Sequence, residues 1–583
     1  MRNGDWMMVS EPAKDLFQAM PITRRRLLRW LGAAAGTAAT LGVLAACGRS
    51  GGADTPSDSP GSSDDSGSDA ASTPSSTNDG ASEPKVGGQW TIAISEDPDT
   101  LDPQKTAAAA TGGIFRYVGD TLVTRDFDKN IVPSLATKYE VSDDGLVWTF
   151  EIREGVMFHD GTPADAAAIK ASFERALAPE TASPIASGLL GPVDTISVEG
   201  STLRVTLKEP FAIFLDNMTD PRSAPISVAA AEQAGDQFGR KPIATGPWKV
   251  AEWQSGTQIV LERNPDYAWG PAFLHDGAAY IDRLVYRIMP EPATAMTAFE
   301  AGEVDQVSIN PPDVERIESS GKYQIVKFLR NGVGLFMEFN VTKSPFDDIT
   351  VRQAMNYAIN KEDVLQTGLD GLGEIAYGPL PPSIWGYWEG IEDYAPSYNP
   401  DKALELLSQA GWTKNSDGLL EKDGQPFMFT LLTMATDTWS KSAQVVQAQL
   451  KQLGITMEIQ TFEFATLLEK MKAGEHQAGF MGYTYTSPDI LYVWFHSSNI
   501  GSGLTLSHHK DDELDKMIEE SRSESDEDKR LQLYQDIQKY IVDKALWVPL
   551  WINYNYIGLQ KRIANARVHP EGFVALFDAS ITE

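Results

Sequence analysis

The stretch that decides the fold is residues 133–177, PSLATKYEVSDDGLVWTFEIREGVMFHDGTPADAAAIKASFERAL. Over 146–152 large apolar residues alternate with smaller or polar ones, which predicts a half-buried strand. Asp-Asp-Gly at 143–145 stands directly before this strand and is typical of a hairpin turn. A helix is expected afterwards, with Thr162 as its N-cap and Pro163 as its first residue. The stretch is therefore predicted to be scaffold.

Further strands are predicted outward from this stretch, on both sides of it. Residues 89–94 and 203–207 alternate in the same way, and 248–261 gives another strand signal. Together with the quoted stretch, these segments predict a first half of the folded chain that is rich in β-structure.

The second half alternates between helices and strands. Asn399-Pro400 provides an N-cap followed by proline at the first helical position, and Gly411 is expected to end that helix. Residues 440–453 carry apolar residues on one face, and 455–459 follow as a strand. This order is typical of βαβ units, so a partly parallel sheet is predicted between 340 and 550.

The quoted stretch closely resembles the signature of the family 5 extracellular solute-binding proteins. These are the oligopeptide-, dipeptide- and nickel-type receptors of ABC importers. The core matches are SDDG, WTF, REGV and FHDGTP, and further landmarks of the family follow in the expected order at 99–103, 245–248, 263–267, 299–305 and 351–354. The resemblance covers about residues 88–570.

The resemblance implies an α/β chain with the two-lobed fold of periplasmic binding proteins, a hinge, and a smaller domain inserted in the first lobe. Lobe I would comprise residues 88–124, 241–335 and 555–583, the inserted domain 125–240, and lobe II 336–554. The ligand would lie between the lobes, and closure requires contacts from both of them. The partners implied are a small-molecule or peptide ligand and ABC permease subunits. The receptor is expected to be a monomer without cofactor or catalytic residues.

The first 46 residues are predicted to be an export signal. Arg24-Arg25 belongs to a basic segment that resembles the twin-arginine motif, and the uncharged run that follows is short and weakly apolar for a membrane span. Residues 44–47, LAAC, resemble a bacterial lipobox, in which the cysteine is acylated and becomes the first residue of the mature protein. Cys47, the only cysteine, is therefore expected to anchor the protein at the outer face of the cell membrane.

Two questions about the N-terminus stay open, namely the export route (twin-arginine or general secretory) and the start codon (Met1 or Met20). Residues 47–86 are predicted to be the lipid anchor and a disordered linker, because glycine, serine, aspartate and threonine dominate them and no aromatic residue occurs.

Composition excludes several kinds of partner. The chain of 583 residues carries a net charge of −32, which argues against nucleic acid and against an anionic membrane surface as binding partners. A single cysteine also excludes an intramolecular disulfide.

Residues 482–489, GYTYTSPD, correspond to a segment that carries a charged contact in peptide-binding members of the family. There the pattern is roughly GWxxDYPDP, and its first aspartate pairs with the α-ammonium of the peptide. Tyr483 replaces the tryptophan here and Thr486 replaces that aspartate. Because an enclosed ammonium without an opposite charge costs several kcal/mol, we expect a ligand without a free α-amine at this point.

Such a ligand would be a sugar, a blocked peptide or another polar metabolite. The alternative, in which the register shifts and Asp489 or another acid pairs with an amine, stays open. The candidate ligand-binding residues come from this segment, from the acids after the first strand, and from aromatic residues whose faces suit sugars and side chains alike. They are Glu96, Asp97, Trp385, Tyr483, Thr484, Tyr485, Thr486, Asp489, Trp551 and Tyr554.

Metal binding by protein side chains is not expected. His508 and His509 are adjacent, and adjacent residues on a strand point to opposite faces. The sequence has neither an HExxH motif nor a cysteine cluster. A chelated metal or an oligosaccharide remains an alternative ligand for the same receptor fold. A secreted, lipid-anchored hydrolase is the alternative outside it, although the SxxK of Ser319 and Lys322 lacks its KTG companion.

Overall fold

The computed structural model describes residues 84–582. The predicted export signal at 1–46, the predicted acylation site Cys47 and most of the predicted linker at 47–86 lie outside these residues. Within residues 84–582, no helix combines the length and the apolar character that a membrane crossing requires.

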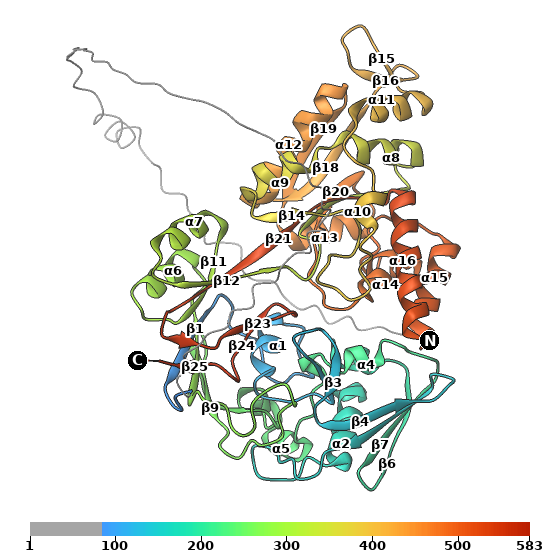
Figure 1. Cartoon of the computed structure of the whole chain (residues 1–583). Coiled ribbons are helices and arrows are strands. Elements are labelled where there is room, and N and C mark those ends of the chain that lie inside the picture. The colour runs from blue at the N-terminus through green and yellow to red at the C-terminus, as the bar shows by residue number, and fades with distance from the viewer. Residues whose placement is uncertain (1–83, 583) are drawn as a thin grey trace, which may run out of the picture. The chain divides into compact units, whose positions relative to one another are not determined.

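A mixed sheet of 12 strands organises residues 84–582, in the order β19-β18-β20-β13-β21-β11-β1-β10-β9-β8, with β12 and β14 also paired with β21. We call β1 and β8–β12 with their helices the first lobe, and β13, β14 and β18–β20 with theirs the second lobe (Figure 1). The strands are β1 (Gln89–Ile94), β8 (Trp248–Gln254), β9 (Gln258–Arg263), β10 (Arg283–Ile288), β11 (Gln306–Ile309), β12 (Gln324–Leu329), β13 (Leu335–Phe339), β14 (Gly373–Ile375), β18 (Met428–Met434), β19 (Thr456–Phe462), β20 (Ala478–Met481) and β21 (Trp547–Leu559).

Strand β21 joins the two lobes. Its beginning pairs antiparallel with β13, and its end pairs antiparallel with β11 and β12. Figure 1 shows it as one long strand that runs from one lobe into the other. The chain passes between the lobes a second time through residues 330–334, which connect β12 to β13. Two adjacent backbone segments therefore connect the lobes, the arrangement that a hinge requires.

Helices surround the sheet in both lobes. Those of the first lobe are α1 (Ala109–Phe115), α6 (Pro292–Glu300) and α7 (Pro311–Ser320). Those of the second are α8 (Ile349–Ala358), α9 (Lys361–Leu369), α10 (Ile391–Tyr394), α11 (Pro400–Gln409), α12 (Asp437–Leu453), α13 (Phe464–Lys472), α14 (Ile490–Phe495), α15 (Asp512–Ser523) and α16 (Glu527–Lys544). Three short pairs of strands and one small three-stranded sheet complete the lobes. The pairs are β2 (Val123–Arg125) with β3 (Ile131–Pro133), β22 (Ile563–Ala564) with β25 (Ser580–Ile581), and β23 (Arg567–His569) with β24 (Phe573–Ala575). In the three-stranded sheet, β16 (Leu420–Lys422) lies between β15 (Thr413–Lys414) and β17 (Gln425–Pro426).

The quoted stretch forms part of a separate four-stranded sheet, which we call the inserted sheet, in the order β4-β5-β7-β6. Its strands are β4 (Ala136–Val141), β5 (Val147–Ile152), β6 (Val193–Glu199) and β7 (Thr202–Leu207), and its helices are α2 (Ala166–Leu177), α3 (Ala186–Leu190), α4 (Phe214–Asn217) and α5 (Val228–Ala234). The predicted hairpin turn is confirmed, because β4 and β5 pair antiparallel and Gly145 has φ 69°, a value that suits glycine.

The predicted start of the following helix is wrong. Helix α2 begins at Ala166, and the side chain of Asp165 caps it by accepting a hydrogen bond from the Ala168 N–H. Pro163 instead forms an isolated β-bridge with Met157, and the Thr162 hydroxyl donates to Asp160. The backbone pairing keeps Pro163 outside the helix, so the next capping side chain takes over.

The other predicted elements are found with small shifts. Asn399 caps α11 as expected, while α12 begins at Asp437 because the Thr436 side chain caps it there. Strand β18 runs parallel to β19 and β20, which confirms the partly parallel sheet. The strand signal at 248–261 corresponds to two strands, β8 and β9, joined by a hairpin.

Each lobe has its own hydrophobic core. The core of the first lobe extends into the inserted sheet, where Phe150 is fully buried, and contains the fully buried Trp90 and Trp248. The second lobe has one core on each face of its sheet, around Leu335 and around Phe336. Burial of each large side chain stabilises the fold by about 1.5–3 kcal/mol, so each lobe is held together independently of what lies between the lobes.

Candidate functional site

A cavity of about 640 Å³ lies between the inserted sheet and the second lobe. Its volume falls within the range of small-molecule sites. We call it the cleft. On one side the lining comes from residues 125–148 and 212–216, and on the other from Trp385, Pro488, Arg530, Tyr534 and the beginning of α16. A ligand in the cleft would therefore contact two parts of the molecule that have separate cores.

A smaller pocket of about 20 Å³ adjoins the cleft and shares Arg125, Lys129 and Trp385 with it. Thr486 of the second lobe and Glu571 of the first also line this pocket. Through Thr486, this pocket brings the segment 482–489 beside the cleft.

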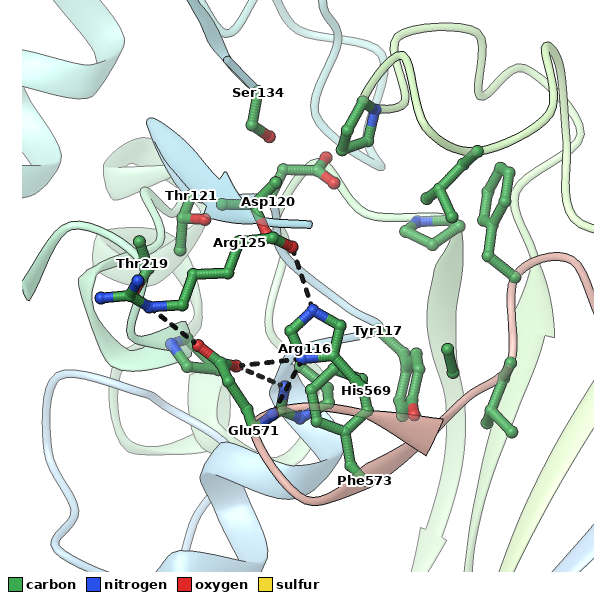
Figure 2. Close-up of a pocket in the computed structure, with 18 of the residues that line it drawn as sticks. Arg116, Tyr117, Asp120, Thr121, Arg125, Ser134, Thr219, His569, Glu571 and Phe573 are labelled. Carbon is green, nitrogen blue, oxygen red and sulfur yellow. Dashed lines mark hydrogen bonds and ion pairs between the residues drawn. The ribbon is translucent and has the colours of Figure 1, made fainter. Parts of the chain in front are cut away.

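A third cavity, about 130 Å³, lies in the first lobe, and Figure 2 shows it. Glu571 stands at its centre, with its carboxylate 3.5 Å from Arg116 Nη1 and 3.7 Å from Arg125 Nε. Arg125 also forms an ion pair with Asp216, and its carbonyl contacts His569 Nε2 at 3.0 Å. The arginines of this cavity are thus neutralised by acids of the same chain.

Near the cleft, Asp489 Oδ1 lies 2.8 Å from Arg522 Nε. Burial raises the pKa of Asp489 to about 6, although the neighbouring guanidinium opposes the shift. The guanidinium of Arg522 also lies over the Tyr492 ring, 3.8 Å from its centre. Asp489 is therefore already engaged within the protein.

Comparison with known proteins gives this geometry a context. Residues 130–502 match the family model of bacterial extracellular solute-binding proteins, family 5. The chain belongs to this family. Receptors of this kind bind solutes for ABC transporters and are not enzymes.

Two curated relatives cover most of this family 5 protein. The oligopeptide-binding protein AppA of Bacillus subtilis is 29% identical over 502 residues, 84% of this chain and 91% of the relative. Heme-binding protein A of Haemophilus influenzae is 28% identical over 482 residues, 78% and 84% of the two chains. The structure of AppA with a nonapeptide matches with a TM-score of 0.69 at 28% identity, over 86% of this chain and 100% of the other. The solute-binding protein thus has the two-lobed α/β fold of its family, with the inserted sheet attached to the first lobe.

Among the candidate residues of this solute-binding protein, Trp385 and Thr486 line the cleft or the pocket beside it. Tyr485 is half-buried, and the charges that act on its hydroxyl come from both sides, from Asp220 and Arg222 as well as from Asp489 and Arg522. Thr484 is exposed.

Two aromatic candidates lie in the core of the second lobe. The Tyr483 hydroxyl donates to the Pro379 carbonyl, and its ring packs near Phe336. Trp551 is 3% exposed, and its Nε1 lies 3.3 Å from the Ser442 hydroxyl. Neither side chain lines the cleft in this structure.

The remaining candidates lie on the first lobe or at its junction with the second. Glu96 is exposed, whereas Asp97 accepts hydrogen bonds from the Trp253 indole, the Ser255 hydroxyl and the Gly256 N–H. Burial alone would raise the pKa of Asp97, but these hydrogen bonds together lower it. The same bonds hold the turn between β8 and β9 in place. Tyr554 donates to Glu374, and burial raises its pKa to about 12.

The cleft contains residues that sequence reasoning missed, above all Arg125, Lys129 and Arg530. Arg125 and Lys129 belong to one unremarkable charged segment and Arg530 to another, far away in the chain, and no local pattern distinguishes them. Only the folded arrangement brings them to one cavity.

The histidines at 159, 508 and 509 contact backbone carbonyls. His159 Nε2 contacts the Gly246 carbonyl, His508 Nε2 the Met471 carbonyl and His509 Nε2 the Phe495 carbonyl. His508 and His509 lie in a loop rather than on the strand assumed from sequence. Residues 84–582 contain no group of three His, Cys, Asp or Glu side chains that could hold a metal ion.

Proposed function

We propose that this protein is an extracytoplasmic receptor, anchored to the membrane through an acylated Cys47, that delivers a peptide-like or other polar solute to an ABC importer. The observation that carries the proposal is the cleft, whose lining comes from the inserted sheet on one side and from the second lobe on the other. A solute bound there gains contacts from both sides only when they are close together, which is the requirement for ligand-driven closure. Permease subunits would recognise the closed form.

The proposal includes a division of the chain into lobe I (88–124, 241–335 and 555–583), an inserted domain (125–240) and lobe II (336–554). Two observations support it. The boundary near 335 falls where β13 begins, and the boundary at 554 falls within β21, the strand that pairs with both lobes.

The proposal also includes a ligand that does not depend on a free α-amine. Thr486 offers a neutral hydroxyl at the position where peptide receptors carry an acid, and the nearest acid in that segment, Asp489, is paired with Arg522. An ammonium would have to break this ion pair to be neutralised.

Calorimetry with short peptides tests the ligand class. We expect the wild-type protein to bind N-acetylated tripeptides at least as tightly as unblocked ones. The Thr486→Asp variant should gain a preference for the free amine of about tenfold, because a charged hydrogen bond contributes about 1.5–3 kcal/mol. A wild-type protein that already prefers unblocked peptides would refute this part of the proposal.

The receptor function itself has a separate test. Mass spectrometry of solutes that copurify with the full-length protein should identify a bound polar molecule, and adding it back should raise the melting temperature. Turnover of ester, amide or glycoside substrates by the same preparation would favour a hydrolase instead.

A further inference from the structure

The cleft contains two cationic side chains without a carboxylate partner. Lys129 Nζ lies 3.2 Å from the Pro382 carbonyl. Arg530 Nη1 lies 3.2 Å from the Ala212 carbonyl and 3.3 Å from the Glu524 carbonyl. Among residues 84–582, neither cation has a carboxylate oxygen within the 4.0 Å of an ion pair. Both are held in place by backbone oxygens, which leave their charge uncompensated.

Other arginines around the cleft are compensated. Arg125 pairs with Asp216 and Glu571, Arg222 with Asp220, and Arg522 with Asp489. Lys129 and Arg530 differ from them, although both are half-buried and line the same cavity. Partial burial makes an unpaired charge costly, and an oppositely charged ligand group would remove that cost.

The acids of the cleft do not offset these two cations. Asp216 is paired with Arg125, and Glu140 is exposed and paired with Lys138. Asp128 and Glu527 are also exposed, so water solvates them at the edge of the cavity. The more buried part of the cleft therefore carries an excess of positive charge.

An aromatic surface adjoins this charge. Trp385 is half-buried in the cleft wall, and the Arg530 guanidinium lies 4.9 Å from the centre of its ring. Tyr534 meets the same ring edge-on at 5.7 Å and holds it in place. A flat or apolar group could pack on the indole while an anionic group binds the neighbouring cations.

We propose that the solute bound in this cleft is an anion, whose carboxylate or phosphate oxygens bind Lys129 and Arg530 and whose apolar part packs against Trp385. This inference rests on the proposed receptor function. Lys129 belongs to the first-lobe side of the cleft and Arg530 to helix α16 of the second lobe. One anionic group that contacts both would hold the two sides together.

The test uses the full-length protein and pairs of probes in which one member carries an anionic group and the other does not. One pair is N-acetyl-alanyl-phenylalanine as the acid and as the carboxamide, and the other is phenyl phosphate and phenol. The acid or the phosphate should bind, and its neutral counterpart should bind at least tenfold more weakly. Which of the two anions binds more tightly distinguishes a carboxylate from a phosphate ligand.

Variants assign the effect to the two cations. Lys129→Met and Arg530→Gln should each weaken binding of the anion by roughly ten- to a hundredfold. Arg530→Lys, which keeps the charge, should restore part of the loss. Lys170→Met is the matched control, because this lysine of helix α2 pairs with Glu174, neither residue lines the cleft, and the change should leave binding unchanged.

The outcomes separate the two proposals. If the copurifying solute is neutral or cationic, or if the neutral probes bind as tightly as the anions, the anionic ligand is refuted while the receptor function stands. If no solute copurifies and no probe binds, both proposals fail. Unchanged binding in Lys129→Met and Arg530→Gln would refute the assigned residues.

Discussion

At the scale of single residues, Glu338 on β13 is a charge-bearing group with no part in the cleft. Its side chain is fully buried in the second lobe. Burial raises its pKa well above the usual value of 4.5, although Trp547 and Ser507 lower it through hydrogen bonding. Folding therefore shifts the ionisation equilibrium of Glu338 toward the protonated form.

A raised folded-state pKa fixes the sign of the pH dependence. The stabilising contribution of Glu338 is fully present below pH 4.5 and is lost as the pH rises toward the folded-state pKa. Glu338→Gln removes the ionisation, so its free energy of unfolding should gain on the wild type as the pH rises from 5 to 7, by at most about 1.4 kcal/mol per pH unit. Urea unfolding at three pH values measures this gap.

The control for Glu338 is Glu458→Gln, because Glu458 is exposed on β19 of the same sheet. The difference in free energy of unfolding between Glu458→Gln and the wild type should stay nearly constant over this pH range. A constant gap for Glu338→Gln as well would contradict a neutral, buried carboxyl group.

At the scale of elements, the segment between β12 and β13 is one of the two connections between the lobes. Gly332 lies in it with φ 143°, and a Cβ there would be 2.1 Å from the Tyr483 carbonyl oxygen. We expect Gly332→Ala to lower the free energy of unfolding by about 3 kcal/mol or more, because backbone must move to accept the methyl group. Thermal and urea unfolding test this.

A second glycine with a positive φ serves as a control that distinguishes the cost of a steric clash from the cost of backbone strain. Gly256, in the turn between β8 and β9, also has a positive φ of 71°, but nothing lies within 4 Å of its added Cβ. Gly256→Ala should therefore cost only about 1 kcal/mol. Equal losses in the two variants would mean that the contact with Tyr483 is not what constrains Gly332.

Elements whose signals are local could be predicted from the sequence. The turn at 143–145 and the start of α11 at Asn399 depend on neighbouring residues alone. The start of α2 could not, because a pairing between Met157 and Pro163 decides it. The lining of the cleft and its adjoining pocket follows the same rule, since the family pattern pointed to Thr486 and aromatic character to Trp385, whereas only tertiary structure brings Lys129 and Arg530 to one cavity.

Trp551 illustrates a second limit of predicting side-chain positions from the alternation of apolar and polar residues along a strand. A strand pattern tells which residues share a face, but β21 is covered on both faces over much of its length. The pattern therefore could not tell a side chain that lines a cleft from one that packs in a core.

At the scale of the whole molecule, the predicted anchor determines where the receptor works. Cys47→Ala should move most of the protein from the membrane fraction to the soluble fraction of the cells or the medium. Fractionation followed by immunoblotting measures this, with Ser50→Ala as the control for a change in the same tract. Retention of the Cys47→Ala protein in the membrane would contradict anchoring by acylation.

The two sides of the cleft already touch in this structure. The Ala212 N–H donates to the Arg522 carbonyl at 2.6 Å, and Lys129 reaches Pro382. Arg530 also donates to the Ala212 carbonyl, so a ligand bound in the cleft would add to contacts that already join the two sides. Such a ligand couples the stabilities of both lobes.

If the ligand couples the stabilities of the two lobes, thermal unfolding should show it. A solute at one hundred times its dissociation constant should stabilise the protein by about 2.7 kcal/mol, which raises the melting temperature by roughly 5–11 °C for domains of about 150–250 residues. Because the solute contacts both sides of the cleft, calorimetry should show the transitions of the two lobes rising together. At the same solute concentration, Arg530→Gln should reduce the stabilisation to about 0.4–1.4 kcal/mol, because binding that is ten- to a hundredfold weaker leaves the solute at one to ten times its dissociation constant. A solute that stabilises one lobe and leaves the other unchanged binds outside the cleft, and closure would then need another cause.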